Sequence, residues 1–348
     1  MTNVDYPVAR RTVIKGAGIG IGAGLVCPLV GAGSSAAAEE TAAPAASAEI
    51  RSSEYWAKKG DVSLYLYRKR IGQPTPSKSS PPVLFLVHGS SISARPTFDL
   101  TVPGRGEYSL MDTFARYDFD VWTMDHENYG RSSRTEGNSD IASGVADLKA
   151  AAEVVMRESG HQRFHFCGES SGALRAGAFA MVRPERVDRL VLLAFTYKGE
   201  GSPTLAKRAE QLAYYRTHNM WLRDRAMIRS IFTRDKAGTS EPEVAEALAD
   251  AELKFGDQAP TGTYLDMTAN LPVVDPERVQ RPVLLARGEY DGIATVDDIY
   301  EFYKHLPSGD RQLAILPGSA HSLVLAKNRQ LLWHVMREFL TMPPVVAT

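Results

Sequence analysis

The chain has 348 residues, of which 44% are hydrophobic, and a formal net charge of -1 at pH 7. This length suits one large α/β domain with an insertion, or two small domains. The balanced charge gives no electrostatic reason to expect nucleic acid or an anionic membrane as a partner. The two cysteines are Cys27 and Cys167. Because Cys27 lies in an expected leader, the mature chain would hold no pair that could form an intramolecular disulfide.

Residues 1–38 have the pattern of an export signal. Residues 10–15 read R-R-T-V-I-K, which resembles the twin-arginine export motif, and the glycine-rich run after them is too short for a membrane span. An A-x-A-like cleavage site follows at Ala38. We therefore expect the twin-arginine machinery to export the protein to the periplasm or beyond. The alternative is a disordered basic N-terminus. Residues 39–49 are predicted to be a low-complexity linker.

Residues 50–197 predict the first part of an α/β core. Residues 83–87 read V-L-F-L-V, a continuous apolar run typical of a central strand covered on both faces. Residues 62–70 alternate, which favours an edge strand. The further expected strands are 120–125, 163–167 and 187–195, and the expected helices are 139–159 and one that begins at Ser171.

The pattern changes over residues 198–275, which we predict to be an inserted helical cap without a strong strand. It is rich in aromatic and long side chains, which indicate an apolar or aromatic substrate or simply the packing of the cap. Its basic residues either attract a substrate with a free carboxylate or lie on solvated helix faces. They are Lys207, Arg208, Arg216, Arg223, Arg225, Arg229 and Arg234.

The core pattern resumes over residues 276–342 and ends in a short tail, residues 343–348. Strands are expected at 282–286 and 312–316, and helices at 296–306 and 321–340. Strands that alternate with helices predict an α/β fold with a mostly parallel sheet.

Residues 168–172 read G-E-S-S-G and join an apolar strand to an alanine-rich helix. Glycines on both sides of Ser170 allow a sharp, strained turn that lifts its hydroxyl out of the sheet. The first amides of the helix, including that of Ser171, then point at whatever Ser170 attacks.

Four chemically competent residues directly follow predicted strands: His88, Ser170, Asp291 and His321. Ligand sites of parallel sheets lie at the carboxyl ends of the strands, so these residues are expected to converge. A serine hydroxyl needs a base such as histidine, and a carboxylate orients that histidine. The order of serine, aspartate and histidine along the chain fits this chemistry.

From residue 50 to 340 the chain resembles the α/β-hydrolase superfamily. The matching pieces are His88 with Gly89, residues 168–172, residues 288–291 (G-E-Y-D) and residues 317–321 (P-G-S-A-H). The resemblance implies an α/β-hydrolase fold, with a mostly parallel eight-stranded sheet flanked by helices and an inserted helical cap. A loop of the family, D-x-R-G-x-G-x-S, is matched only in part, because Glu127 replaces the arginine and Asn128 the first glycine.

The resemblance also implies roles for individual residues. It makes Ser170 the nucleophile, His321 the base and Asp291 the orienting acid. Because some relatives place the acid after the sixth strand, Glu200 is the alternative acid. The oxyanion hole would consist of the backbone N–H groups of Ser90 and Ser171, with Ser91 a weaker candidate than Ser90.

We therefore predict an exported serine hydrolase that cleaves a small-molecule carboxylic ester through an acyl-serine intermediate. An amidase, lactonase or peptidase on the same triad is the alternative, and a non-catalytic binding protein with this fold is a third possibility. No cofactor is expected, because the sequence shows no metal-ligand cluster and its glycine-rich run, residues 16–24, lies in the leader with no strand before it. The oligomeric state is left open.

Overall fold

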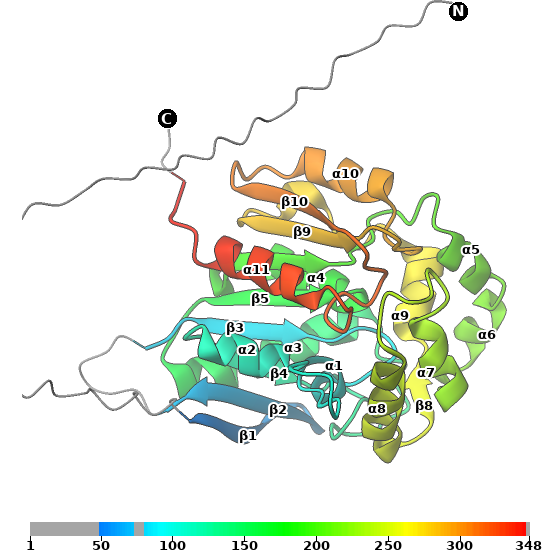
Figure 1. Cartoon of the computed structure of the whole chain (residues 1–348), viewed down its shortest axis with the longest axis horizontal. Coiled ribbons are helices and arrows are strands. Elements are labelled where there is room, and N and C mark those ends of the chain that lie inside the picture. Colours follow the sequence, from blue (N-terminus) through cyan, green and yellow to red (C-terminus); the bar gives the residue numbers. More distant parts are fainter. Residues whose placement is uncertain (1–48, 73–79, 346–348) are drawn as a thin grey trace, which may run out of the picture. The chain divides into compact units, whose positions relative to one another are not determined.

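The computed structural model describes residues 49–72 and 80–345 (Figure 1). The expected leader, nearly all of the expected linker and the last three residues lie outside this described part. Its main sheet has eight strands in the order β1-β2-β4-β3-β5-β6-β9-β10. The strands are β1 Ile50–Lys59, β2 Val62–Ile71, β3 Val83–Val87, β4 Asp120–Met124, β5 Phe164–Glu169, β6 Val187–Leu193, β9 Val283–Gly288 and β10 Arg311–Leu316.

The sheet is parallel from β4 to β10, and β2 and β1 continue it as antiparallel strands. The expectation that residues 62–70 form an edge strand is wrong. β2 lies between β4 and β1, and β1 is the edge strand. β1 pairs with β2 over its whole length, from Ile50 opposite Ile71 to Lys59 opposite Val62.

Helices cover both faces of the sheet. Successive side chains of β3 point to opposite faces, so β3 contacts both layers of helices. Phe85 packs in the core beneath α3 and α4, whereas Leu84 and Leu86 pack in the core beneath α2 and α11. The helices of the two layers are α1 Ala94–Phe98, α2 Leu110–Arg116, α3 Ile141–Ser159, α4 Ser171–Val182, α10 Val296–His305 and α11 Arg329–Leu340.

The terminal helix begins later than expected. Residues 321–340 were predicted as one helix, but α11 starts at Arg329. The segment before it is an irregular loop in which Leu323, Val324 and Leu325 are buried. Burial of these apolar side chains mimics a helical pattern in the sequence, while the loop leaves His321 at the end of the sheet.

Residues 198–275 form five short α-helices together with a two-stranded antiparallel sheet that the sequence did not indicate. In Figure 1 these helices gather beyond the carboxyl ends of the parallel strands. No helix of the described residues is long and apolar enough to cross a membrane. The elements are α5 Pro203–Ala209, α6 Leu212–Thr217, β7 Met220–Leu222, α7 Arg225–Ile231, α8 Pro242–Glu252, β8 Gln258–Pro260 and α9 Gly262–Leu265.

Candidate active site

Ser170 occupies the turn between β5 and α4 with φ 58° and ψ -125°, a backbone conformation that costs a non-glycine residue on the order of 1–3 kcal/mol. The flanking glycines are required by packing. A Cβ atom on Gly168 would lie 2.3 Å from the carbonyl oxygen of Gly172, and a Cβ atom on Gly172 would lie 2.1 Å from that of Val87. The turn is therefore fixed by contact between backbones.

Three loops at the carboxyl ends of the strands bring Ser170, Asp291 and His321 together. Nε2 of His321 lies 2.9 Å from Oγ of Ser170, and Nδ1 lies 2.9 Å from Oδ1 of Asp291. With its proton on Nδ1, His321 donates to Asp291 and accepts from the serine hydroxyl. These contacts have the geometry that a serine nucleophile and its base require.

The buried carboxylate of Asp291 is held by the backbone as well as by His321. Its Oδ1 accepts hydrogen bonds from the N–H groups of Ile293 and Ala294, at 2.8 and 3.0 Å. Burial alone raises the pKa of Asp291, but the charge of His321 and these hydrogen bonds outweigh burial, so the pKa lies below its usual value. Asp291 is therefore ionised at neutral pH.

Glu200, the alternative acid, is exposed, and within the described residues it makes no hydrogen bond or ion pair with His321. Its backbone carbonyl accepts a hydrogen bond from Thr295 instead. The structure thus brings Asp291, and not Glu200, to the histidine.

Ser90 and Ser171 lie next to each other beside Ser170. Oγ of Ser90 donates to Oγ of Ser171 at 2.8 Å, and Ser171 is the first residue of α4, where backbone N–H groups are free of helical hydrogen bonds. A Cβ on Gly89 would lie 3.4 Å from the Cβ of Ser170, so the turn after β3 approaches the nucleophile closely. The hydroxyl of Tyr129 donates to the carbonyl of Ser90 at 2.6 Å and anchors this turn.

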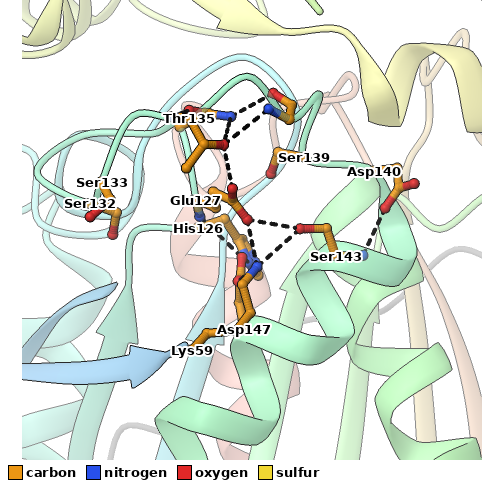
Figure 2. Close-up of polar contacts among 12 residues, drawn as sticks. Lys59, His126, Glu127, Ser132, Ser133, Thr135, Ser139, Asp140, Ser143 and Asp147 are labelled. Atoms are coloured by element: carbon orange, nitrogen blue, oxygen red, sulfur yellow. Dashed lines mark hydrogen bonds and ion pairs between the residues drawn. The ribbon is translucent and has the colours of Figure 1, made fainter. Parts of the chain in front are cut away.

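A buried polar network around Asp147 (Figure 2) reaches this turn through His126 and His88. Asp147 on α3 accepts the N–H of Glu127 at 3.0 Å and contacts Nδ1 of His126 at 3.1 Å. The N–H of His126 donates to Nε2 of His88 at 3.1 Å, and Nδ1 of His88 lies 2.9 Å from the carbonyl oxygen of Gly89. Burial holds the pKa of His88 well below its usual value, so this histidine is a neutral linker.

The departure from the family loop at Glu127 and Asn128 belongs to this network. Glu127 pairs with Lys59 at the end of β1, at 2.6 Å, and Lys59 also pairs with Asp147 (Figure 2). Asn128 has φ 68°, a left-handed conformation that a glycine adopts freely and that asparagine tolerates. Both residues therefore have defined structural roles in this loop.

Glu169 and Cys167 precede the nucleophile and are both buried. Burial raises the pKa of the Glu169 carboxyl to about 7, although the N–H groups of Val324 and Leu323 partly offset that effect. Burial likewise raises the pKa of the Cys167 thiol well above its usual value, so this cysteine is a packing residue rather than a nucleophile.

A pocket above Ser170 and His321 is lined by both parts of the chain. The core contributes Ser90 and Glu169, and the insertion contributes Ile231, Phe232 and Leu248 together with two arginines, Arg208 and Arg234. A larger pocket adjoins it and is lined by the aromatic residues Tyr215, Trp221, Tyr264 and Tyr290. The sequence could not single out the two arginines, because nothing in its pattern distinguishes them from the other basic residues of the segment.

No group of three or more His, Cys, Asp or Glu side chains in the described part of the chain could hold a metal ion.

An eight-stranded, mostly parallel sheet flanked by helices, with a serine on the turn after its fifth strand, defines an α/β hydrolase. Residues 101–328, about two thirds of the chain, match the model of a family described as "Serine aminopeptidase, S33". The chain therefore belongs to this family of hydrolases. No curated protein matches the chain.

Several solved structures share the fold. One is a malate-bound thermophilic esterase from Thermogutta terrifontis, 17% identical, with a TM-score of 0.60 over 83% of this chain and 98% of that one. Epoxide hydrolase A from Mycobacterium thermoresistibile is 18% identical, with a TM-score of 0.60 over 85% and 100% of the two chains. A 2-hydroxy-6-oxo-6-phenylhexa-2,4-dienoate hydrolase from Rhodococcus sp. strain RHA1 is 20% identical, with a TM-score of 0.58 over 84% and 100%. At these identities the likeness shows the fold alone.

Proposed function

We propose that this hydrolase cleaves carboxylic esters through an acyl-serine intermediate. The observation that carries the proposal is the contact of His321 with both Ser170 and Asp291, each at 2.9 Å. Ser170 is the nucleophile, His321 the general base and Asp291 the group that orients the histidine.

The steps follow from these positions. His321 takes the hydroxyl proton as Ser170 attacks the ester carbonyl, and the backbone N–H groups of Ser90 and Ser171 hold the resulting oxyanion. His321 then protonates the leaving alcohol, and the acyl-serine forms. A water molecule that gives its proton to His321 hydrolyses the acyl-serine and restores the free enzyme.

An amide or peptide is the second candidate substrate, because the family carries a peptidase description. An aminopeptidase must accommodate the ammonium group of its substrate, which acidic side chains would attract. The pocket above Ser170 presents the cations Arg208 and Arg234 instead, and its glutamate, Glu169, bonds to backbone N–H groups. These charges favour an ester over a peptide with a free amine. The aromatic walls of the adjoining pocket support an apolar or aromatic part in the substrate.

Labelling by a fluorophosphonate probe tests the nucleophile directly. We expect the wild-type protein to be labelled and Ser170→Ala to remain unlabelled with an unchanged circular dichroism spectrum. Turnover of matched phenyl esters and anilides then separates esterase from amidase. A folded wild-type protein that resists labelling and cleaves neither substrate would favour a binding function for this fold.

We further propose export by the twin-arginine route to the periplasm or the exterior, on the basis of residues 10–15. Replacement of Arg10 and Arg11 by lysine in the full chain should retain the protein in the cytoplasm. Unchanged export of that variant in cell fractionation would contradict the route.

A further inference from the structure

Two arginines of the insertion line the pocket that contains the candidate nucleophile. Arg208 lies on α5 and Arg234 follows α7, and both share the pocket with Ser170 and His321. The same two side chains also line the larger pocket beside it, whose wall includes Tyr264. Both guanidinium groups therefore stand where the two pockets adjoin.

Three other arginines of the insertion have strong carboxylate partners. Arg223 is fully buried and pairs with the buried Glu252. Arg225 and Arg229 lie at the surface and pair with Glu246, at 3.0 and 2.5 Å. Arg225 and Arg229 lie on a solvated helix face, as one of the two interpretations of the sequence expected. The buried Arg223 fits neither interpretation, because it packs inside the insertion.

Arg208 and Arg234 are more weakly paired than these three. Among the described residues Arg208 pairs with no carboxylate, and its Nη1 is buried without a hydrogen-bond partner, while its guanidinium lies 4.9 Å from the ring centre of Tyr264. Nε of Arg234 is also buried without a hydrogen bond and lies 3.5 Å from Oδ1 of Asp235. One carboxylate thus faces two guanidinium groups.

The charges around this point leave a positive excess. Burial first, and then the charge of Arg234, lower the pKa of Arg208 to about 10, so Arg208 stays charged at neutral pH. The larger pocket also contains Lys207 and Glu210, whose charges offset each other. A buried guanidinium nitrogen without a partner costs free energy that an anionic oxygen of a ligand would recover.

We propose that Arg208 and Arg234 form a carboxylate subsite beside Ser170, so that the enzyme prefers esters that carry a second, ionised carboxyl group. This inference rests on the ester hydrolysis proposed above and names its substrate class. Two guanidinium groups and Asp235 leave one net positive charge. Glu169 in the same pocket, with its pKa raised to about 7, offsets this charge only in part at neutral pH. The remaining excess matches a carboxylate better than a doubly charged phosphate. Planar guanidinium groups also bind carboxylates through paired hydrogen bonds.

Three matched benzyl esters test the subsite and locate the carboxylate. Monobenzyl adipate carries it on the acyl side, 4-carboxybenzyl hexanoate carries it on the alcohol side, and benzyl hexanoate is neutral. We expect kcat/KM for one of the two charged esters to exceed that for the neutral ester by about 10- to 100-fold, as a hydrogen bond between charged groups implies. The charged ester that is preferred shows on which side the carboxylate binds. Equal or faster cleavage of the neutral ester would overturn the proposal.

Single variants attribute the preference to the two arginines. Arg208→Gln and Arg234→Gln should each lose about 10- to 100-fold on the preferred charged ester and change by less than about 3-fold on benzyl hexanoate. Arg229→Gln, the same change at the exposed helix surface, is the control and should leave both rates unchanged. If Arg208→Gln and Arg234→Gln slow both esters equally, the subsite is refuted.

A binding measurement separates this proposal from the proposed chemistry. Ser170→Ala should bind monobenzyl adipate or 4-carboxybenzyl hexanoate more tightly than benzyl hexanoate in calorimetry, and Arg208→Gln in that background should abolish the difference. If the wild-type protein cleaves no ester but this binding preference is present, the ester hydrolysis fails and the subsite stands. If esters are cleaved without any preference in rate or binding, the subsite alone fails.

Discussion

The loops around Ser170 and the insertion over residues 198–275 hold their buried charges in different ways. In the loops, the partners of these charges are mainly backbone N–H groups. Asp291 accepts two of them, at 2.8 and 3.0 Å, and Glu169 accepts that of Val324 at 3.3 Å.

In the insertion the partners are mainly side chains. Arg223 pairs with Glu252, and Arg229 pairs with Glu246. A substitution other than proline leaves a backbone N–H in place, whereas it readily removes a side-chain partner. This difference is consistent with our proposal that the fold fixes the reaction and the insertion sets the charge of the substrate.

The largest effect is expected for the acid of the triad. Asp291→Asn should lower kcat by about 10⁴-fold, because the amide cannot hold His321 in the reactive tautomer. Glu200→Gln is the matched control at the alternative position and should stay within about 2-fold of the wild type, because Glu200 is exposed. Steady-state kinetics on a phenyl ester checks both, and the reverse ranking would make Glu200 the acid.

The buried ion pair of the insertion should matter for stability. Arg223→Met leaves the Glu252 carboxylate buried without its partner, and we expect the free energy of unfolding to fall by about 3–5 kcal/mol. Arg229→Met breaks an exposed pair and should cost far less, because solvent screens exposed charges. Urea denaturation measures both, and equal losses would contradict the distinction.

Glu169 should make the free energy of unfolding depend on pH. Burial raises its pKa from 4.5 to about 7, so between these values the folded state keeps a proton that the unfolded state has lost. The stability that this provides is present below pH 4.5 and disappears as the pH rises to about 7. Between pH 5 and 7 the free energy of unfolding of the wild type should therefore fall by about 2 kcal/mol relative to Glu169→Gln.

Urea denaturation between pH 5 and 7 checks the effect, with the exposed Glu153→Gln as control. Burial lowers the pKa values of His88 and His126, which acts in the opposite direction below pH 6.5. That contribution is common to all variants and cancels in the comparison. Parallel curves for the wild type and Glu169→Gln would show that Glu169 does not hold its proton.

The smallest effect is expected for Tyr129, which contacts the turn that contains Ser90. Tyr129→Phe removes the hydroxyl that anchors the carbonyl of Ser90, and one hydrogen bond is worth about 1 kcal/mol. We expect kcat to fall by about 5-fold with KM unchanged, because the turn positions a donor for the transition state. A change in KM alone would place Tyr129 in substrate binding instead.

Much of the core follows from the sequence because its signals are local. The apolar run at 83–87 and the glycines around Ser170 each report their own surroundings. β1 was missed because Ala57 is its only fully buried side chain, so pairing with β2 rather than hydrophobic alternation defines it.

The contacts of the insertion with the site could not be predicted from its sequence in the same way. Short amphipathic helices conceal which face meets the site, so Arg208 and Arg229 look alike in the sequence although only Arg208 lines the pocket. The later start of α11 had a related cause, since Leu323 and Val324 are buried by tertiary contacts that a periodic pattern does not reveal.

The backbone strain at Ser170 has an evolutionary consequence. A glycine at this position would adopt φ 58° and ψ -125° freely, and relief of about 1–3 kcal/mol of strain would exceed the entropy that a glycine costs, about 1 kcal/mol. Selection for heat resistance alone would therefore favour replacement of Ser170 by glycine, which would abolish the proposed activity. A lineage that keeps serine here does so against its own stability, which marks the turn as maintained for its chemistry.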